Sequence, residues 1–164
     1  MEERLLTTPS DDDDGEQCWT PQGVKILLAN DQKVKVAGID FDGIPRGKVM
    51  SKEKFLSSLD NGGFGMSSAV FGWDMHDVLY AVKTSVTSST KGYQDFTVEV
   101  DLASMRRLPF EDGLPFFLLR FISRGEPVCV DGRNIVAALS TDLELAGMRG
   151  LAGGSFPHHC SFAF

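Results

Sequence analysis

The stretch KVKVAGIDFDGIPRGKVM, residues 33–50, decides the fold expected for this chain. Its first half, residues 33–41, begins with valines alternating with lysines, which predicts a half-buried strand. The Asp42-Gly43 pair is a strong turn signal, because both residues tolerate a left-handed backbone. Residues 46–50 can return as a second strand, so the stretch predicts a β-hairpin.

Helix signals flank this hairpin on both sides. Thr20 and Pro21 are typical of a helix start, because threonine can accept from an unpaired backbone amide and proline has no amide to lose. Ser51 is expected to cap a second helix, with Phe55 on its apolar face, and this helix should end at the asparagine and glycines of residues 61–63.

The second half of the chain predicts more strands and one more helix. The elements expected there are a glycine-rich loop over residues 65–72, an exposed loop over 84–93, a strand over 96–101, and hairpin strands over 116–122 and 126–130. Asp131 can cap a final helix. Its inner side is expected to hold Ile135, Val136, Leu139, Leu143 and Ala146.

Two hairpin-like strand pairs with helices between and after them indicate an α+β fold. We expect one mixed sheet with the helices packed on one face. Because a helix follows the first hairpin, the order of elements is β-grasp-like.

Charge is unevenly distributed along the chain. The net charge is -7 over 164 residues, and residues 2–16 hold seven acids and one base, Arg4. We therefore expect a disordered acidic tail over residues 1–18, a folded domain over 19–147 and an irregular C-terminal tail over 148–164. The nearly neutral body argues against nucleic acid as a partner, since binding it requires a basic face.

Cysteine content and hydropathy predict a cytoplasmic protein. Cys18, Cys129 and Cys160 show no CxxC spacing, and an odd count without a secretion signal is typical of reduced thiols. No apolar run reaches the roughly 18 residues that a membrane-spanning helix needs, so no membrane association is expected.

Three motifs, in order, resemble the glutamine synthetase family. They are IDFDGIPRGK at residues 39–48, FGWDMHD at 71–77 and DLASMRRLPFE at 101–111. Each motif is weak evidence alone, but their order and spacing also fit. The match covers most of the chain and is similar to the N-terminal β-grasp domain of fungal glutamine synthetase-like proteins.

The resemblance implies an ATP-dependent ligase chemistry for the parent enzyme. Such enzymes phosphorylate the γ-carboxylate of glutamate, and ammonia or an amine then displaces the phosphate. ATP and Mg or Mn ions are implied for the full-length family, because divalent ions neutralise phosphoryl charge. The implied partners are copies of the chain or full-length synthetase-like subunits in a ring.

One aspartate is implicated in the amine site by the resemblance. By alignment Asp40 is the family residue that helps to bind ammonium and to remove its proton, as a carboxylate can. The alternative is a turn-capping aspartate that accepts from backbone amides near Gly43. Asp42 is explained by the turn itself, and we assign it no catalytic role.

Four basic residues are candidates for an interface or a substrate loop. Arg46 and Lys48 could face a nucleotide or the acids of a neighbouring subunit, or could simply be solvated. Arg106 and Arg107 could form ion pairs across a subunit interface, or could be a surface pair of little energy. Gly65 is a departure, because some bacterial members carry an acid there, which weakens a claim for ammonia over a bulkier amine.

The end of the chain departs from the family pattern. The family continues into a G-x-E-x-E strand that binds metal, whereas this chain has no glutamate after Glu144 and has Pro157 where the strand should pair. No metal site is expected at His158-His159-Cys160, because adjacent residues on an extended chain point to opposite sides. The resemblance thus implies a fragment without cofactors that is inactive alone; alternatives are a non-catalytic module that joins a synthetase ring, or a free β-grasp interaction domain.

Overall fold

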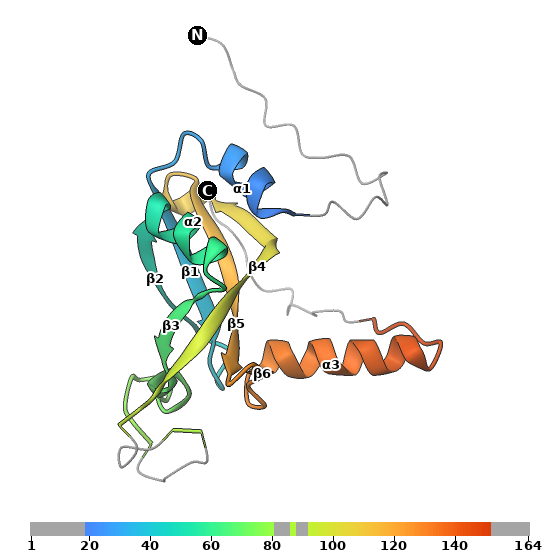
Figure 1. The fold of residues 1–164 in the computed structure, drawn as a ribbon. Helices are drawn as coiled ribbons and strands as arrows, with labels where there is room; N and C mark the ends of the chain where they lie inside the picture. The colour runs from blue at the N-terminus through green and yellow to red at the C-terminus, as the bar shows by residue number, and fades with distance from the viewer. Residues whose placement is uncertain (1–18, 81–85, 88–91, 152–164) are drawn as a thin grey trace, which may run out of the picture. The chain divides into compact units, whose positions relative to one another are not determined.

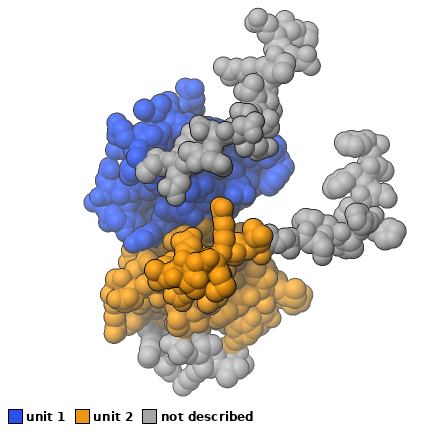
Figure 2. Space-filling view, turned by 90° about the vertical axis from the view of Figure 1, so that its right-hand side faces the viewer, with its two compact units in different colours: residues 1–37, 47–64, 99–119 blue, residues 38–46, 65–98, 120–164 orange. Residues whose placement is uncertain are grey.

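A computed structural model describes residues 19–80, 86–87 and 92–151 (Figure 1). The predictions for the acidic tail, for most of the loop over 84–93 and for residues 152–164 concern positions outside these ranges. Contacts divide the chain into two compact units, coloured in Figure 2. Unit 1 comprises residues 1–37, 47–64 and 99–119, and unit 2 comprises residues 38–46, 65–98 and 120–164.

Six strands form one mixed sheet with the order β2-β1-β5-β4-β3, and β6 pairs with β5. The strands are β1 (Lys33–Ile39), β2 (Pro45–Ser51), β3 (Phe64–Ser67), β4 (Asp95–Leu108), β5 (Leu114–Ser123) and β6 (Glu126–Pro127). β1 and β5 run parallel, with Val36 opposite Phe117, whereas β5 and β6 run antiparallel. The predicted α+β class with a mixed sheet is confirmed.

The described ranges also contain three α-helices and two short 3₁₀ helices. They are α1 (Pro21–Leu27), α2 (Lys52–Asp60), η1 (Ser68–Phe71), η3 (Pro109–Glu111) and α3 (Gly132–Leu145). None of the helices in the described part of the chain is long and apolar enough to cross a membrane.

The helices of unit 1 begin where the sequence predicts. The Thr20 hydroxyl accepts from the Gly23 amide at 3.1 Å, and the Ser51 hydroxyl accepts from the Lys54 amide at 3.3 Å. Each bond pairs one of the amides that a helix start leaves open. The side chain of Lys52 also donates to the carbonyl oxygen of Ala29 at 3.0 Å, which ties α2 to the segment after α1.

The core of unit 1 joins its helices to its strands. Val24 and Phe55 are fully buried, and the ring of Phe55 lies 4.8 Å from that of Phe117 on β5. At Gly47, the glycine of the RGK motif, an added Cβ would lie 1.8 Å from the Val36 carbonyl oxygen. The two strands of the first hairpin therefore approach so closely that only glycine fits at this position.

Phe71 is the centre of the core of unit 2. Its ring centroid lies 4.8 Å from Phe121, 5.6 Å from Phe41 and 6.3 Å from Phe96. The prediction of a glycine-rich loop over residues 65–72 is wrong, because the segment forms the end of β3 and then η1. The burial of its apolar side chains against the phenylalanine cluster outweighs the loop preference of its glycines.

The β5–β6 hairpin turns at the predicted position. Arg124 and Gly125 have φ angles of 55° and 85°, the left-handed backbone that such a two-residue turn needs. Asp131 then caps α3 by accepting from the Arg133 amide at 3.0 Å, and its second oxygen accepts from the Phe121 amide at 2.9 Å. The buried side chain of Asp131 therefore both caps α3 and joins the start of this helix to β5.

The predicted inner side of α3 is not buried in unit 2. Ile135 is 45% exposed, Val136 63% and Leu139 56%, and Asn134 is the buried residue of the helix. The 3.6-residue period identified which side of the helix is apolar, but it cannot say whether residues of the same unit cover that side.

Candidate functional site

The turn between β1 and β2 is built around Asp40. Its side chain is buried, and its Oδ1 accepts from the backbone amides of Asp42 at 2.9 Å and Ile44 at 2.8 Å. Gly43 follows with a φ angle of 80°, which favours glycine. Asp40 thus holds the turn from inside, by the side-chain bonding that makes aspartate common in turns.

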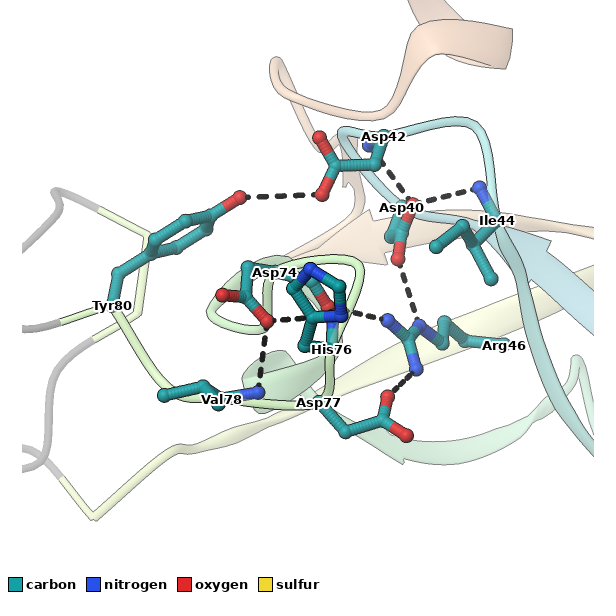
Figure 3. Close-up of polar contacts among 9 residues, drawn as sticks. All are labelled: Asp40, Asp42, Ile44, Arg46, Asp74, His76, Asp77, Val78 and Tyr80. Atoms are coloured by element: carbon teal, nitrogen blue, oxygen red, sulfur yellow. Dashed lines mark hydrogen bonds and ion pairs between the residues drawn. The ribbon is translucent and has the colours of Figure 1, made fainter.

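Arg46 binds the second carboxylate oxygen of Asp40. Its Nε donates to Asp40 Oδ2 at 2.7 Å, its Nη1 pairs with Asp77 Oδ1, and its Nη2 donates to the carbonyl oxygen of Asp74 at 2.9 Å (Figure 3). The guanidinium carbon also lies 5.7 Å from the centre of the Trp73 ring, within the range of a cation–π contact. One side chain thereby touches four residues.

Residues 72–80 fold into a small closed loop. Trp73 and Leu79 form an isolated antiparallel bridge, and the Tyr80 amide donates to the Gly72 carbonyl at 2.8 Å. Inside the loop, the carboxylate of Asp74 accepts from the amides of His76 at 2.8 Å and Val78 at 2.9 Å. The aspartate of the FGWD motif therefore has the same local role as Asp40, which is to pair the amides of its own turn.

The two loops place four carboxylates in one region of unit 2, which we call the acidic corner: Asp40, Asp42, Asp74 and Asp77 (Figure 3). Arg46 is the cation among them, so the corner keeps a negative formal charge. Asp42 is exposed, and the Tyr80 hydroxyl donates to its Oδ2 at 3.5 Å. An exposed negative region of this kind attracts cations, including protonated amines.

The hydrogen bonds of the corner shift the pKa values of three side chains. Bonds to Asp40 and then to Asp77 raise the pKa of the Arg46 guanidinium above its usual value. The amides of Val78 and His76 lower the pKa of the Asp74 carboxyl, because they stabilise its charged form. Partial burial, followed by the charge of Asp42, raises the pKa of the Tyr80 hydroxyl.

The other predicted site residues lie in unit 1. Lys48 is exposed on β2, with its ammonium 4.4 Å from the centre of the Phe64 ring. Arg106 donates from Nε to the carbonyl of Ser104 at 3.3 Å.

Arg107 has an acidic partner within its own unit. It makes a two-pronged pair with both oxygens of Asp31, at 2.9 Å each, and this pairing raises the pKa of Arg107. Its Nη1 also donates to the Gly113 carbonyl at 3.0 Å, so Arg107 ties the segment after α1 to the turn that follows η3.

The meeting of the first two motifs at Arg46 was missed from the sequence. The residues lie 28 and 31 positions apart, and no local pattern connects an arginine on a strand to acids in a distant loop. Complementary charge was the available signal, since FGWDMHD carries two aspartates and the turn motif carries an arginine. Complementary charge is shared by so many pairs of residues in the sequence that it cannot identify the pair that forms.

The described residues do not contain a metal centre. No group of three or more His, Cys, Asp or Glu side chains within ranges 19–80, 86–87 and 92–151 is placed to hold a metal ion. A hollow of about 360 Å³ lies elsewhere in unit 2, with Gln94, Arg124 and Cys129 in its lining. None of the predicted site residues lines it.

Comparisons of sequence place the chain beside known ligases. It is 40% identical over 111 residues to type-1 glutamine synthetase 2 of Dictyostelium discoideum, a match covering 67% of this chain and 21% of that protein. It is 27% identical over 128 residues to a glutamate–isopropylamine ligase of a Pseudomonas species, covering 77% of this chain and 28% of that protein. The chain thus spans between a fifth and a third of the length of these relatives. No family model matches it.

Comparisons of structure give the same fold. A GmaS/ADP complex aligns with a TM-score of 0.57 at 12% identity, over 78% of this chain and 26% of that one. A crystal structure of a glutamine synthase homologue aligns with a TM-score of 0.57 at 17% identity, over 70% of this chain and 27% of that one. At such low sequence identities the structural similarity is evidence for the fold alone.

Proposed function

Because this chain is a homologue of the glutamine synthetase family over about two thirds of its length, we propose that it carries the amine-side loops of an ATP-dependent glutamate ligase. In that reaction a γ-glutamyl phosphate forms first, and ammonia or a small amine then displaces the phosphate. The chain's part is to attract and place the amine, with the rest of the site on other polypeptide that is related to the synthetases.

The observation that carries this proposal is the acidic corner. The corner is formed by the two motifs that the family resemblance rests on, IDFDGIPRGK and FGWDMHD, and it is negative. An amine in water is mostly protonated, so a negative surface raises its local concentration. The corner can therefore deliver the cationic substrate to a reaction whose other substrates are anions.

Within the proposal, Asp40 belongs to the amine site by its charge and its place in the turn. Its carboxylate already accepts from two backbone amides and from the Arg46 guanidinium, so both of its oxygens are engaged within the turn. A buried carboxylate with both oxygens engaged is not placed to contact a substrate directly. We therefore assign Asp40 to attraction and positioning, and the exposed carboxylate of Asp42 to the first contact with the amine.

We assign the binding of ATP and of the divalent metal ions to other polypeptide. Among these residues there is no cluster of metal-binding side chains. In the proposal the phosphoryl transfer takes place on other polypeptide, and the chain alone makes no amide bond.

A chimaera tests the proposal. In the Dictyostelium relative, the region matched by this chain is replaced with the chain's own residues, and amide formation from ATP, glutamate and ammonium or isopropylamine is measured. We expect activity in the chimaera, and a rise of several-fold in the KM for the amine in its D42N variant with the KM for glutamate unchanged. D60N, on α2 of unit 1, is the matched control.

Two outcomes would contradict the proposal. One is ATP-dependent amide formation by the purified chain without any longer relative. The other is an active chimaera in which D42N leaves the amine KM at the wild-type value, because the acidic corner would then play no part in amine capture.

A second candidate function is assembly with related subunits without catalysis. The exposed apolar side of α3 favours it, because neighbouring apolar side chains that are exposed together are typical of protein contacts. Co-elution of the chain with an intact synthetase-like ring, abolished by L139D on α3, is the expected result. Separate elution of the unmodified chain would count against it.

A further inference from the structure

We propose that Arg46 is a positioning residue that clips the Asp40 turn and the loop over residues 72–80 into one rigid surface. The proposal deepens the proposed function, since this surface is the acidic corner. Its test uses the chain alone and does not depend on amide formation, so the two ideas can fail separately.

The first argument is the use of each nitrogen of the guanidinium. Nε donates to Asp40 in the turn, whereas Nη1 and Nη2 reach Asp77 and the carbonyl of Asp74 in the loop. The fork of arginine holds its donors at fixed angles, so that three acceptors bound at once are also fixed relative to one another. Lysine, with a single ammonium, cannot reproduce this arrangement.

The second argument is the weakness of the other forces on the loop. Met75 is 64% exposed, Val78 59% and Leu79 44%, so burial of side chains contributes little to holding the loop in place. By contrast, the side chain of Arg46 is only 14% exposed, and it lies over the Trp73 ring. Beside the long hydrogen bond from the Tyr80 hydroxyl to Asp42 at 3.5 Å, the polar contacts between the loop and the turn are therefore centred on Arg46.

The third argument is the backbone of Asp77. Its φ angle of 62° is uncommon for a residue other than glycine and is less stable than a right-handed conformation. Its amide donates to the Asp74 carbonyl oxygen at 3.1 Å, and that same oxygen accepts from Arg46. The tight turn thus presents both a carboxylate and a carbonyl to the guanidinium, and the contact with Arg46 offsets the backbone cost.

Residue-level hydrogen exchange measured by NMR tests the clip. In R46K we expect the Val78 and Tyr80 amides to exchange at least about tenfold faster, as follows from losing a charge-assisted hydrogen bond. The amides of β4 and β5 should keep their wild-type rates. R107K, which removes the forked contact of Arg107 with Asp31 in unit 1, is the matched control and should leave the loop unchanged.

A double-mutant cycle separates the clip from general stabilisation. D77N alone should accelerate exchange in the loop, and R46K/D77N should be no faster than R46K, because both changes break one contact. Fluorescence of Trp73, measured in a W19F background, should shift in R46K but not in D77N, since Arg46, and not Asp77, lies over the ring.

The proposal is overturned by either of two results. In one, R46K and R46M both fold and leave loop exchange within twofold of wild type. In the other, exchange rises equally in the loop and in β4 and β5, which would make Arg46 an ordinary contributor to global stability. A clip that holds while the chimaera shows no amine dependence would refute the proposed function alone.

Discussion

Replacing Asp40 with alanine should destabilise the chain by about 2–3 kcal/mol. The change removes the acceptor of the Asp42 and Ile44 amides, and a hydrogen bond to a charged group contributes roughly 1.5–3 kcal/mol. We take about 1 kcal/mol for each amide, because the two bonds are only partly buried and water replaces part of the loss. The lost ion pair with Arg46 adds the remainder.

The assay is urea unfolding followed by circular dichroism, with thermal unfolding beside it. For a chain of this size, such a loss should lower the Tm by roughly 4–12 °C. D40N should fall between wild type and D40A, because an amide oxygen can keep the two backbone bonds but not the ionic contact with Arg46. D42A, one turn position away and exposed, is the control and should stay within about 0.5 kcal/mol of wild type.

A D40A variant as stable as D42A would refute the reasoning. The Asp40 carboxylate would then not be held by its own turn, and it would be free to meet a substrate directly. The assignment of Asp40 to positioning would have to be exchanged for proton removal.

Three further predictions concern the same region. D74N should make the free energy of unfolding depend less on pH in the acid range. The pKa of Asp74 is lowered in the folded state, so its contribution to stability is complete above the unfolded pKa of about 4 and is lost as the pH falls through the folded pKa. Urea unfolding of D74N that shows the same pH dependence as wild type would contradict this. In a Y93F background, ultraviolet titration should show a raised pKa for Tyr80 that D42N brings partly back toward normal, since burial is the larger cause and remains; no movement at all would exclude the contact with Asp42. G47A should abolish or severely reduce folded protein in expression and unfolding assays, because the added Cβ would overlap backbone, and near-wild-type stability would show that the hairpin can open.

Local chemistry made the ends of elements predictable. Thr20, Ser51 and Asp131 are helix caps in the structure, as their residue types and spacing indicated. Arg124 and Gly125 form the expected hairpin turn. These features depend on bonds between residues close in the chain, so the sequence within a few positions contains the needed information.

Features that depend on distant contacts were not predictable. The apolar period of α3 identified its apolar side correctly and its burial wrongly, because the covering surface is not a property of the helix itself. The family resemblance pointed to Asp40, yet the pairing of Arg46 with Asp77 depends on how two separate loops fold together. Periodicity has no information about such pairs.

The buried hydrogen bonds of Asp131 hold α3 at its start, and this affects the far end of the helix. α3 is anchored at its first turn, through Asp131 to Phe121 and through the Asn134 side chain to the carbonyl of the same residue at 2.8 Å. The fourteen residues of α3 extend roughly 21 Å from this anchored end. Because the helix is anchored at its first turn, a small tilt there would move its other end, near Leu145, through a much larger arc.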